Sequence, residues 1–367
     1  MDLQKDDMLD NPHMKKHIIV FVQHMTDGGA ERVLSELISY WHTKNARVTV
    51  VETSPKKFKE CYYMPDDVED IKLRSTKIKY IDYAIVYLSM IRIMRKNPKA
   101  SVLAFTEATI LKLALALPFV NNRIVLSLRN DPVSTPDSKI YRRLRDWAFQ
   151  KSNANVFQTA DAMHYFPQEV WSKSVIIPNP INPDIPEVYT GLREKKIVAV
   201  GRLSKQKNFK MLINAFALLH KDFPEYFLYI YGRGELEDEL RKQTEDLGVT
   251  ENVVFPGFSQ HIYQDICKSA LYVSSSDYEG ISNSMLEALA LGLPSVVTDC
   301  PAGGARLAIT DRENGLLIPT GDEQALYTAM KYMLENPEEA IRMGKNAAKI
   351  RERWPIEKIA DRWLELF

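Results

Sequence analysis

The 367-residue sequence is poor in cysteine and histidine and has no excess charge of either sign. Its three cysteines, Cys61, Cys267 and Cys300, lack Cys-x-x-Cys spacing. This argues against a disulfide framework and a structural zinc site, and it favours a reducing cytosol. Lysine plus arginine total 48, as do aspartate plus glutamate, so no overall field favours nucleic acid as a partner. Any anionic ligand must therefore be bound by local groups.

Long hydrophobic runs are also missing. The longest, such as residues 110–120, are too short and too interrupted to span a bilayer, and residues 1–16 lack the apolar core of a signal peptide. We therefore expect a cytoplasmic protein, either soluble or attached peripherally at the inner face of the cell membrane. The chain exceeds the roughly 250–300 residues at which one hydrophobic core stops growing, so two domains are expected.

Strand-like and helix-like segments alternate along the first half of the chain. After a polar tail at residues 1–13, an apolar run at 17–23 leads through Gly28-Gly29 into a helical pattern that ends near Trp41. Further elements are expected as strands at 47–52, 101–105 and 123–128, with helices at 83–95 and 108–117. This alternation predicts a parallel sheet between helices, a doubly wound α/β domain over residues 14–180.

The second half repeats this pattern after a proline-rich segment at residues 178–186, where we place the interdomain linker (181–190). A domain over residues 191–353 is predicted from a helix at 211–219 and from strands at 196–200, 227–231, 253–255, 270–274 and 295–298. Two such domains should face each other across a ligand-binding cleft. Residues 354–367 place proline at a helix start before an apolar stripe, and this helix is expected to return to the first domain.

The strongest candidate site lies at residues 274–289, where a buried strand leads into a polar loop and then a helix. Ser282 and Asn283 are good N-cap residues, so the free N–H groups of this helix would bind an anion. Glu287 projects from the same helix face as Asn283, and Glu279 belongs to the loop. Alone, two glutamates are better explained as a helix-dipole partner and a solvated charge. Beside an anion site, however, they would accept hydrogen bonds from sugar hydroxyls, which suggests a nucleotide sugar.

Two cations follow the strand at 196–200 and support this interpretation. Arg202 can bind two phosphate oxygens at once, whereas Lys207 supplies a point charge. Both are expected on the same sheet edge as the two glutamates. The sequence holds no Asp-x-Asp motif, and its seven histidines do not cluster with acids at metal-ligand spacing, so we expect neither a metal nor another cofactor.

Together these motifs resemble the retaining glycosyltransferases of family four, which have the GT-B fold. The resemblance covers nearly the whole chain after Met14. The motifs that carry it are Gly28-Gly29-Ala30-Glu31-Arg32, Gly201-Arg202-Leu203 with Lys207, residues 231–236, Glu279 through Glu287, and Gly292-Leu293-Pro294. The resemblance implies two doubly wound, Rossmann-like domains facing a cleft, with the C-terminal helix crossing back to the first domain.

The resemblance also implies a role for each charged residue. Arg202 and Lys207 would neutralise the donor diphosphate and the charge that develops as the glycosidic bond breaks. Glu279 would hold hydroxyls of the transferred sugar, and Glu287 would hold those of the ribose. The leaving phosphate itself would help to deprotonate the acceptor hydroxyl.

Backbone groups would complete the donor site. By the same resemblance, Gly28 and Gly29 would approach the diphosphate from the first domain, where the absence of a Cβ allows close contact. An ordinary tight turn is the alternative for these two glycines, and a strand-ending turn is the alternative for residues 231–234. The remaining sugar and phosphate contacts would come from Gly280, Ile281, Ser282 and Asn283.

One position departs from the family. Many members carry a histidine near the transferred sugar, and here that place is held by Arg129 or Asn130. An arginine cannot shuttle protons at neutral pH. These two residues would therefore contact the sugar, a phosphate or the acceptor instead of acting as a base.

The implied reaction is metal-independent, retaining transfer of a hexose or N-acetylhexosamine. The donor would be a nucleotide-diphosphate sugar, with uridine expected because similar enzymes of surface-polysaccharide pathways commonly use it. The acceptor would be a glycan or a lipid-diphosphate-linked sugar in the synthesis of capsule, lipopolysaccharide or another surface polysaccharide. A nucleotide-sugar epimerase on the same fold and a noncatalytic sensor of nucleotide sugars remain alternatives.

The basic segment 139–151 has two interpretations. Ile140, Leu144, Trp147 and Ala148 would form an apolar stripe with basic residues elsewhere. Such a helix suits contact with an anionic membrane surface. It also suits a core-packed helix whose solvated face is basic.

Overall fold

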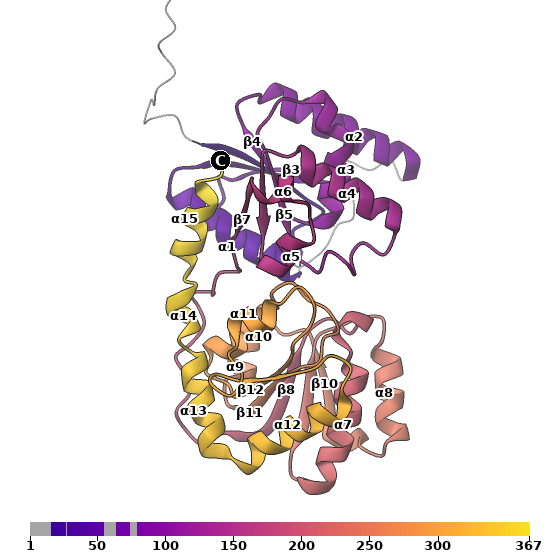
Figure 1. The fold of residues 1–367 in the computed structure, drawn as a ribbon, viewed down its shortest axis with the longest axis vertical. Coiled ribbons are helices and arrows are strands. Elements are labelled where there is room, and N and C mark those ends of the chain that lie inside the picture. The colour runs from indigo at the N-terminus through magenta and orange to yellow at the C-terminus, as the bar shows by residue number, and fades with distance from the viewer. Residues whose placement is uncertain (1–15, 27, 55–63, 74–78) are drawn as a thin grey trace, which may run out of the picture.

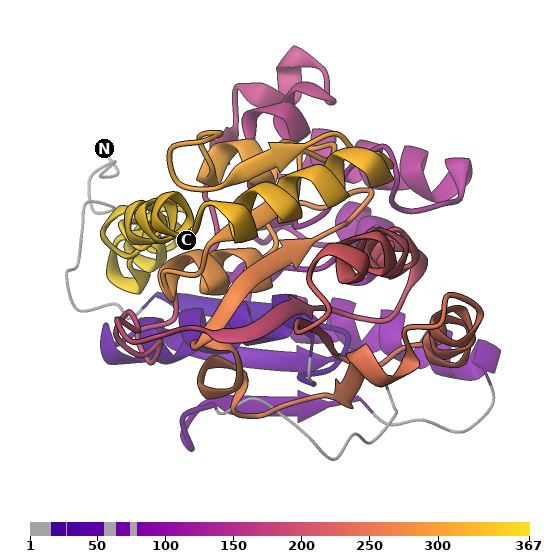
Figure 2. The ribbon, with the colours of Figure 1, turned by 90° about the horizontal axis from the view of Figure 1, so that it is seen from below.

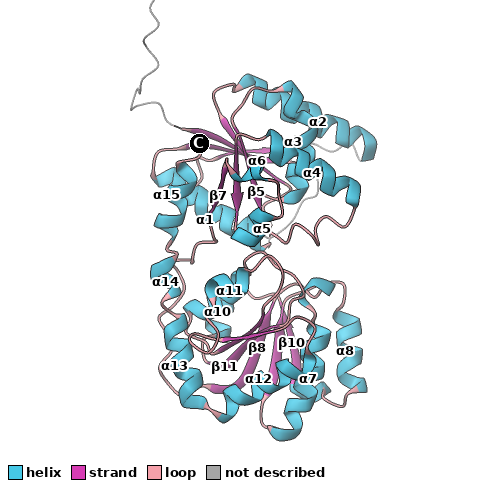
Figure 3. Cartoon of the chain, viewed as in Figure 1, coloured by secondary structure: helices cyan, strands magenta, loops and turns pink. Residues whose placement is uncertain are grey.

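The computed structural model describes residues 16–26, 28–54, 64–73 and 79–367. It contains two parallel sheets with helices on either side of each, arranged one above the other (Figure 1; Figure 3). The predicted fold class is confirmed. The polar tail expected at 1–13, and Cys61, lie outside the described residues.

The first sheet has seven strands in the order β3-β2-β1-β4-β5-β6-β7. Its strands are β1 (His17–Val22), β2 (Arg47–Glu52), β3 (Glu69–Lys72), β4 (Ser101–Ala104), β5 (Ile124–Leu128), β6 (Ala154–Phe157) and β7 (Ser174–Ile176). Its helices are α1 (Gly29–Thr43), α2 (Lys79–Lys96), α3 (Glu107–Ala116), η1 (Leu117–Phe119), α4 (Lys139–Lys151), α5 (Ala160–His164) and α6 (Gln168–Trp171).

The second sheet has six strands in the order β10-β9-β8-β11-β12-β13. Its strands are β8 (Glu194–Val200), β9 (Phe227–Tyr231), β10 (Val253–Gly257), β11 (Ser269–Ser274), β12 (Ser295–Thr298) and β13 (Leu316–Ile318). Its helices are η2 (Lys205–Lys207), α7 (Phe209–Asp222), α8 (Glu237–Asp246), η3 (Thr250–Asn252), α9 (Ile262–Ile266), α10 (Asn283–Ala290), α11 (Gly304–Ala308), α12 (Glu323–Glu335) and α13 (Pro337–Ala347).

The strand order places a topological switch in each sheet. The chain leaves β1 for β2 on one side and later returns to place β4 on the other, and β8 is flanked by β9 and β11 in the same way. At a switch the connections depart in opposite directions, so a crevice opens outside the carboxyl ends of the two central strands. The central strands are apolar on both faces because helices cover both, which explains the unbroken buried run Ile18–Val22.

The chain crosses between the domains twice. After α14 (Ile350–Arg353), helix α15 (Ile356–Leu364) packs against α1 of the first domain, where the rings of Trp41 and Trp363 lie 6.4 Å apart. In Figure 1 the helices α13 to α15 run along one side of both domains, and the view from below shows these yellow helices nearly end-on (Figure 2). The amide of Ile181 donates a 2.8 Å hydrogen bond to the carbonyl of Trp354, so the two crossings are joined.

Helix α4 corrects one expectation. Ile140, which we placed on the apolar stripe, is 75% exposed, whereas Arg145 is completely buried. The Arg145 guanidinium donates to the carbonyl of Pro132 at 2.9 Å and pairs with Asp146 at 2.7 Å. These partners satisfy its charge and donors, and this allows a basic residue to occupy an interior position. Within the described part of the chain, no helix is both long and apolar enough to cross a bilayer.

Candidate active site

A cleft of about 1090 Å³ separates the two domains. With one exception, every site residue predicted from the sequence lines it, namely Gly28, Gly29, Arg129, Asn130, Arg202, Lys207, Glu279, Ile281, Ser282, Asn283 and Glu287. The exception is Gly280, which is buried. A Cβ there would lie only 2.6 Å from the carbonyl oxygen of Arg129, so a glycine is needed where the two domains meet.

Lys207 and Glu279 face each other as an ion pair. Lys207 ends η2, just after β8, and Glu279 lies in the loop after the neighbouring strand β11. The Lys207 Nζ is 2.5 Å from the Glu279 Oε1, which also accepts a 3.0 Å hydrogen bond from the Ser276 hydroxyl. Burial acts to lower the pKa of Lys207, but the facing carboxylate outweighs it and holds this pKa above its ordinary value. The lysine is therefore positively charged, and its charge lies at the topological switch between β8 and β11 of the second sheet.

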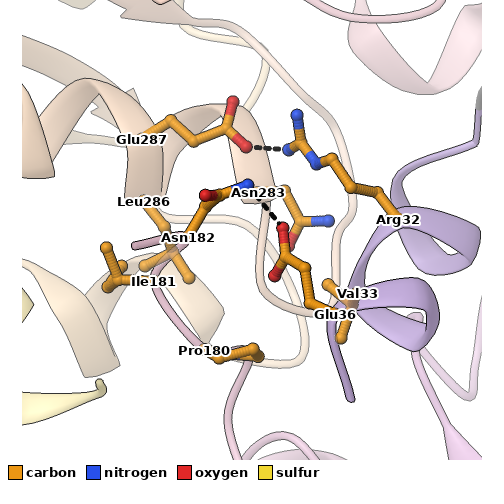
Figure 4. A pocket seen from close by; sticks show the side chains of 9 residues that line it. All are labelled: Arg32, Val33, Glu36, Pro180, Ile181, Asn182, Asn283, Leu286 and Glu287. Atoms are coloured by element: carbon orange, nitrogen blue, oxygen red, sulfur yellow. Dashed lines mark hydrogen bonds and ion pairs between the residues drawn. The ribbon is translucent and has the colours of Figure 1, made fainter. Parts of the chain in front are cut away.

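A second ion pair crosses the cleft from one domain to the other. Arg32 on α1 contacts the carboxylate of Glu287 on α10, and Glu36 lies one turn further along α1 (Figure 4). The Asn182 side-chain amide donates a 2.7 Å hydrogen bond to Glu36. Burial raises the pKa of Glu36 to about 7, although the nearby Arg32 opposes this shift. Glu287 is thus the acid of this cluster that pairs with an arginine, and this arginine lies within the predicted glycine motif.

The N-terminus of α10 is joined to the first domain by hydrogen bonds. Ser282 is the N-cap, as predicted, and its hydroxyl accepts from the amide of Met285 at 3.4 Å. Asn283 donates through its side chain to the carbonyl of Gly29 at 2.7 Å, and the amide of Ile281 donates to the Gln158 side chain at 2.9 Å. Backbone groups that were predicted to meet the donor therefore contact the first domain in this structure.

Asn179 connects these contacts, although no motif in the sequence points to it. Its side-chain nitrogen donates to the carbonyl of Ile281 at 3.1 Å and to the side chain of Asn283 at 2.5 Å. Its side-chain oxygen accepts from Gln158 at 2.8 Å and from the guanidinium of Arg129. One buried amide, two residues before the predicted linker, thus joins both walls of the cleft. The proline-rich segment around it marked a linker, but nothing in its spacing marked a hydrogen-bonding centre.

The turn after β9 explains another motif. Gly232 has φ of 137°, and a Cβ on it would lie 1.9 Å from the carbonyl oxygen of Gly201. The amide of Gly201 in turn donates to the carbonyl of Tyr231 at 2.9 Å. This glycine allows the ends of β8 and β9 to approach each other, and Arg233 beside it lines the cleft. The segment is a strand-ending turn that also forms part of the cleft wall.

Comparison with known proteins finds a family match in the second domain. Residues 184–350 match the family model of the glycosyl transferases group 1. This match spans the second domain. The segment matched by the group 1 model contains Arg202, Lys207, Glu279 and Glu287, whereas Arg32 and Arg129 of the opposite cleft wall lie outside it.

Curated relatives share this region. One is the N-acetylgalactosamine-N,N'-diacetylbacillosaminyl-diphospho-undecaprenol 4-alpha-N-acetylgalactosaminyltransferase of Campylobacter jejuni, which is 37% identical over 162 residues, 44% of this chain and 43% of that protein. Another is the poly(ribitol-phosphate) alpha-N-acetylglucosaminyltransferase of Staphylococcus aureus, 30% identical over 175 residues, 47% of this chain and 35% of that protein. The chain matches less than half the length of these relatives.

Solved structures match nearly the whole chain. A variant of TarM from S. aureus, in complex with fondaparinux, alpha-GlcNAc-glycerol and UDP, has a TM-score of 0.80 at 15% identity, covering 96% of this chain and 99% of that one. HepE from Anabaena, in complex with UDP and glucose, has a TM-score of 0.78 at 19% identity, covering 95% and 98%. These likenesses show the fold, and they confirm the predicted GT-B architecture.

Among the described residues, no cluster of three or more histidine, cysteine, aspartate or glutamate side chains is arranged to hold a metal ion. The described cysteines, Cys267 and Cys300, are both free thiols.

Proposed function

We propose that this protein is a retaining glycosyltransferase of the cytoplasm that uses a nucleotide-diphosphate sugar. It moves a hexose or N-acetylhexosamine from the donor, with uridine as the base, to a glycan or lipid-diphosphate-linked acceptor in surface-polysaccharide synthesis. The observation that carries this proposal is that Arg202, Lys207, Glu279 and Glu287 line one cleft opposite Gly28 and Gly29.

The ligand-free ion pairs suggest how the cleft receives its donor. The ammonium of Lys207 is compensated by Glu279, and the guanidinium of Arg32 is compensated by Glu287. A diphosphate that enters beside Arg202 and Lys207 takes over charge compensation from Glu279. The freed carboxylate then accepts hydrogen bonds from hydroxyls of the transferred sugar. Substrate binding thus replaces one set of charge contacts with another, and sugar hydroxyls satisfy the freed carboxylate by hydrogen bonding.

The same groups serve the chemical step. As the glycosidic bond breaks, negative charge grows on the leaving diphosphate, and Arg202 and Lys207 stabilise it because they are already held in place. The departing phosphate oxygen, on the same face of the sugar as the acceptor, removes the proton of the acceptor hydroxyl. The configuration at the anomeric carbon is retained, and the step needs no metal and no cofactor.

The relatives' names support the acceptor class. The C. jejuni relative is named for a diphospho-undecaprenol substrate, and the S. aureus relative is named for poly(ribitol-phosphate). We propose a carrier of this chemical type here, with peripheral contact to an anionic membrane. Ile140 and Tyr141 of α4 support that contact, since both side chains are more than half exposed beside the basic residue Arg143.

Mass spectrometry of products from a panel of uridine and guanosine diphosphate sugars, with lipid-diphosphate acceptors, tests this function. We expect a glycosylated acceptor with the donor's anomeric configuration, formed equally well in the presence of EDTA. Conversion of the donor into an epimer without any acceptor product would identify an epimerase. Donor binding with neither transfer nor hydrolysis would identify a sensor, and either result would refute the proposal.

A further inference from the structure

Arg129 stands at the carboxyl end of β5, on the first-domain wall of the cleft. Its guanidinium lies over the ring of Phe105, 4.7 Å from the centroid, and one Nη donates to the side-chain oxygen of Asn179. The other Nη has only a long contact of 3.5 Å with the Ser127 hydroxyl. A guanidinium has five N–H donors, so most of its hydrogen-bonding capacity is not used by these neutral partners.

No carboxylate of a described residue forms an ion pair with Arg129, which sets it apart from two other cleft cations. Lys207 is paired with Glu279 and Arg32 with Glu287. Burial lowers the pKa of Arg129 to about 9, with no anion acting to restore it. The side chain remains charged at neutral pH, and the aromatic face of Phe105 compensates that charge only in part. A partly buried cation that is held without a counter-ion is costly unless a ligand supplies one.

The position of Arg129 indicates which ligand would do so. Arg202 and Arg233, which also lack an ion pair among the described residues, belong to the second domain, on the wall assigned to the diphosphate. Arg129 faces them from the other wall, with its backbone against Gly280, next to the acid assigned to the transferred sugar. Its fork is held by Asn179 and Phe105 before any ligand enters. Such a fixed fork matches the paired oxygens of a carboxylate or phosphate.

We propose that Arg129 binds an oxyanion of the substrate other than the donor diphosphate. Two sources have this chemistry: the carboxylate of a hexuronic acid as the transferred sugar, or a phosphate of the acceptor. Arg129 would meet either oxyanion on the side of the cleft that is assigned to the transferred sugar. The proposal rests on the proposed transfer function and makes it more specific, because it requires one substrate to be charged beyond the nucleotide.

Calorimetric titration with UDP, UDP-glucose and UDP-glucuronic acid tests whether the oxyanion belongs to the transferred sugar of the donor. The proteins compared are the wild type, Arg129→Met, Arg129→Lys and, as a control, Arg92→Met, which removes an exposed arginine from α2 of the same domain. If the donor carries the oxyanion, the wild type binds UDP-glucuronic acid about 10- to 100-fold more tightly than UDP-glucose. Arg129→Met removes this preference, Arg129→Lys restores part of it, and the affinity for UDP itself does not change.

Transfer to matched phosphorylated and dephosphorylated acceptors tests whether the oxyanion is a phosphate of the acceptor. If the acceptor carries the oxyanion, the KM for the phosphorylated acceptor rises about 10- to 100-fold in Arg129→Met and the donor KM stays constant. The proposal is overturned if the wild type binds UDP-glucose and UDP-glucuronic acid equally well and also binds the phosphorylated and dephosphorylated acceptors equally well. A loss of UDP affinity in Arg129→Met also overturns it, since Arg129 would then bind the diphosphate. Failure of the wild type to bind UDP at all would show instead that the proposed function is wrong. Thermal unfolding checks that each variant is folded. If Arg129→Met does not fold, Arg129→Lys provides the test.

Discussion

Glu36 makes the stability of this protein depend on pH in an unusual direction. Burial raises the pKa of its carboxyl from 4.5 to about 7, so the folded state holds a proton that the unfolded chain has already lost. Between these two values the folded state binds more protons, and the free energy of unfolding must therefore fall as pH rises. One pKa unit is equivalent to ~1.4 kcal/mol, so ionised Glu36 costs the folded state up to ~3 kcal/mol above pH 7.

The substitution Glu36→Gln keeps the shape of the protonated acid and an oxygen that can accept from Asn182. We expect it to leave the free energy of unfolding unchanged near pH 4.5 and to raise it by ~2–3 kcal/mol at pH 8. Urea unfolding of both proteins at several pH values measures this difference. Glu169→Gln is the matched control, because Glu169 is an exposed glutamate of the same domain. A constant difference between Glu36→Gln and the wild type across this pH range would contradict the reasoning.

Three further results are expected. Lys207→Ala and Glu279→Ala should each lower kcat/KM for transfer by ~100-fold or more, with weaker UDP binding in Lys207→Ala, and wild-type rates in both would refute the site. Trp363→Ala should destabilise the first domain by ~3–5 kcal/mol in urea unfolding, because this ring is completely buried; an unchanged midpoint would show that α15 contributes little. Gly232→Ala should lower both the melting temperature and the affinity for UDP, since its Cβ would collide with Gly201, whereas normal values would show that the turn can relax.

The sequence predicts the fold because long apolar strands and amphipathic helices repeat clearly in both halves. It fails for the strands β3, β6, β7 and β13, which are only three or four residues long. Such short runs show no clear period, although the equally short β4 and β12 were predicted. Strand β3, with the sequence Glu-Asp-Ile-Lys, is also polar because it lies at the edge of its sheet.

The candidate site is predictable to the extent that each residue follows a strand end. Arg202, Lys207 and Glu279 follow neighbouring strands, and parallel topology alone brings them to one edge. The partners across the cleft depend instead on how the two domains meet. Neither the pairing of Arg32 with Glu287 nor the bonds of Asn179 to Ile281 and Asn283 could be derived from sequence spacing, because the bonded groups are more than 100 positions apart in the chain.

The return of α15 to the first domain has a consequence for how this protein is made. Trp363 belongs to the same buried cluster as Trp41, and its ring also contacts Phe105, so the first domain lacks part of its own core until α15 has been synthesised. The second domain, by contrast, can complete its sheet on the ribosome. We therefore expect the domain translated first to be the last to reach its native state, with α1 exposing an apolar groove to chaperones in the meantime.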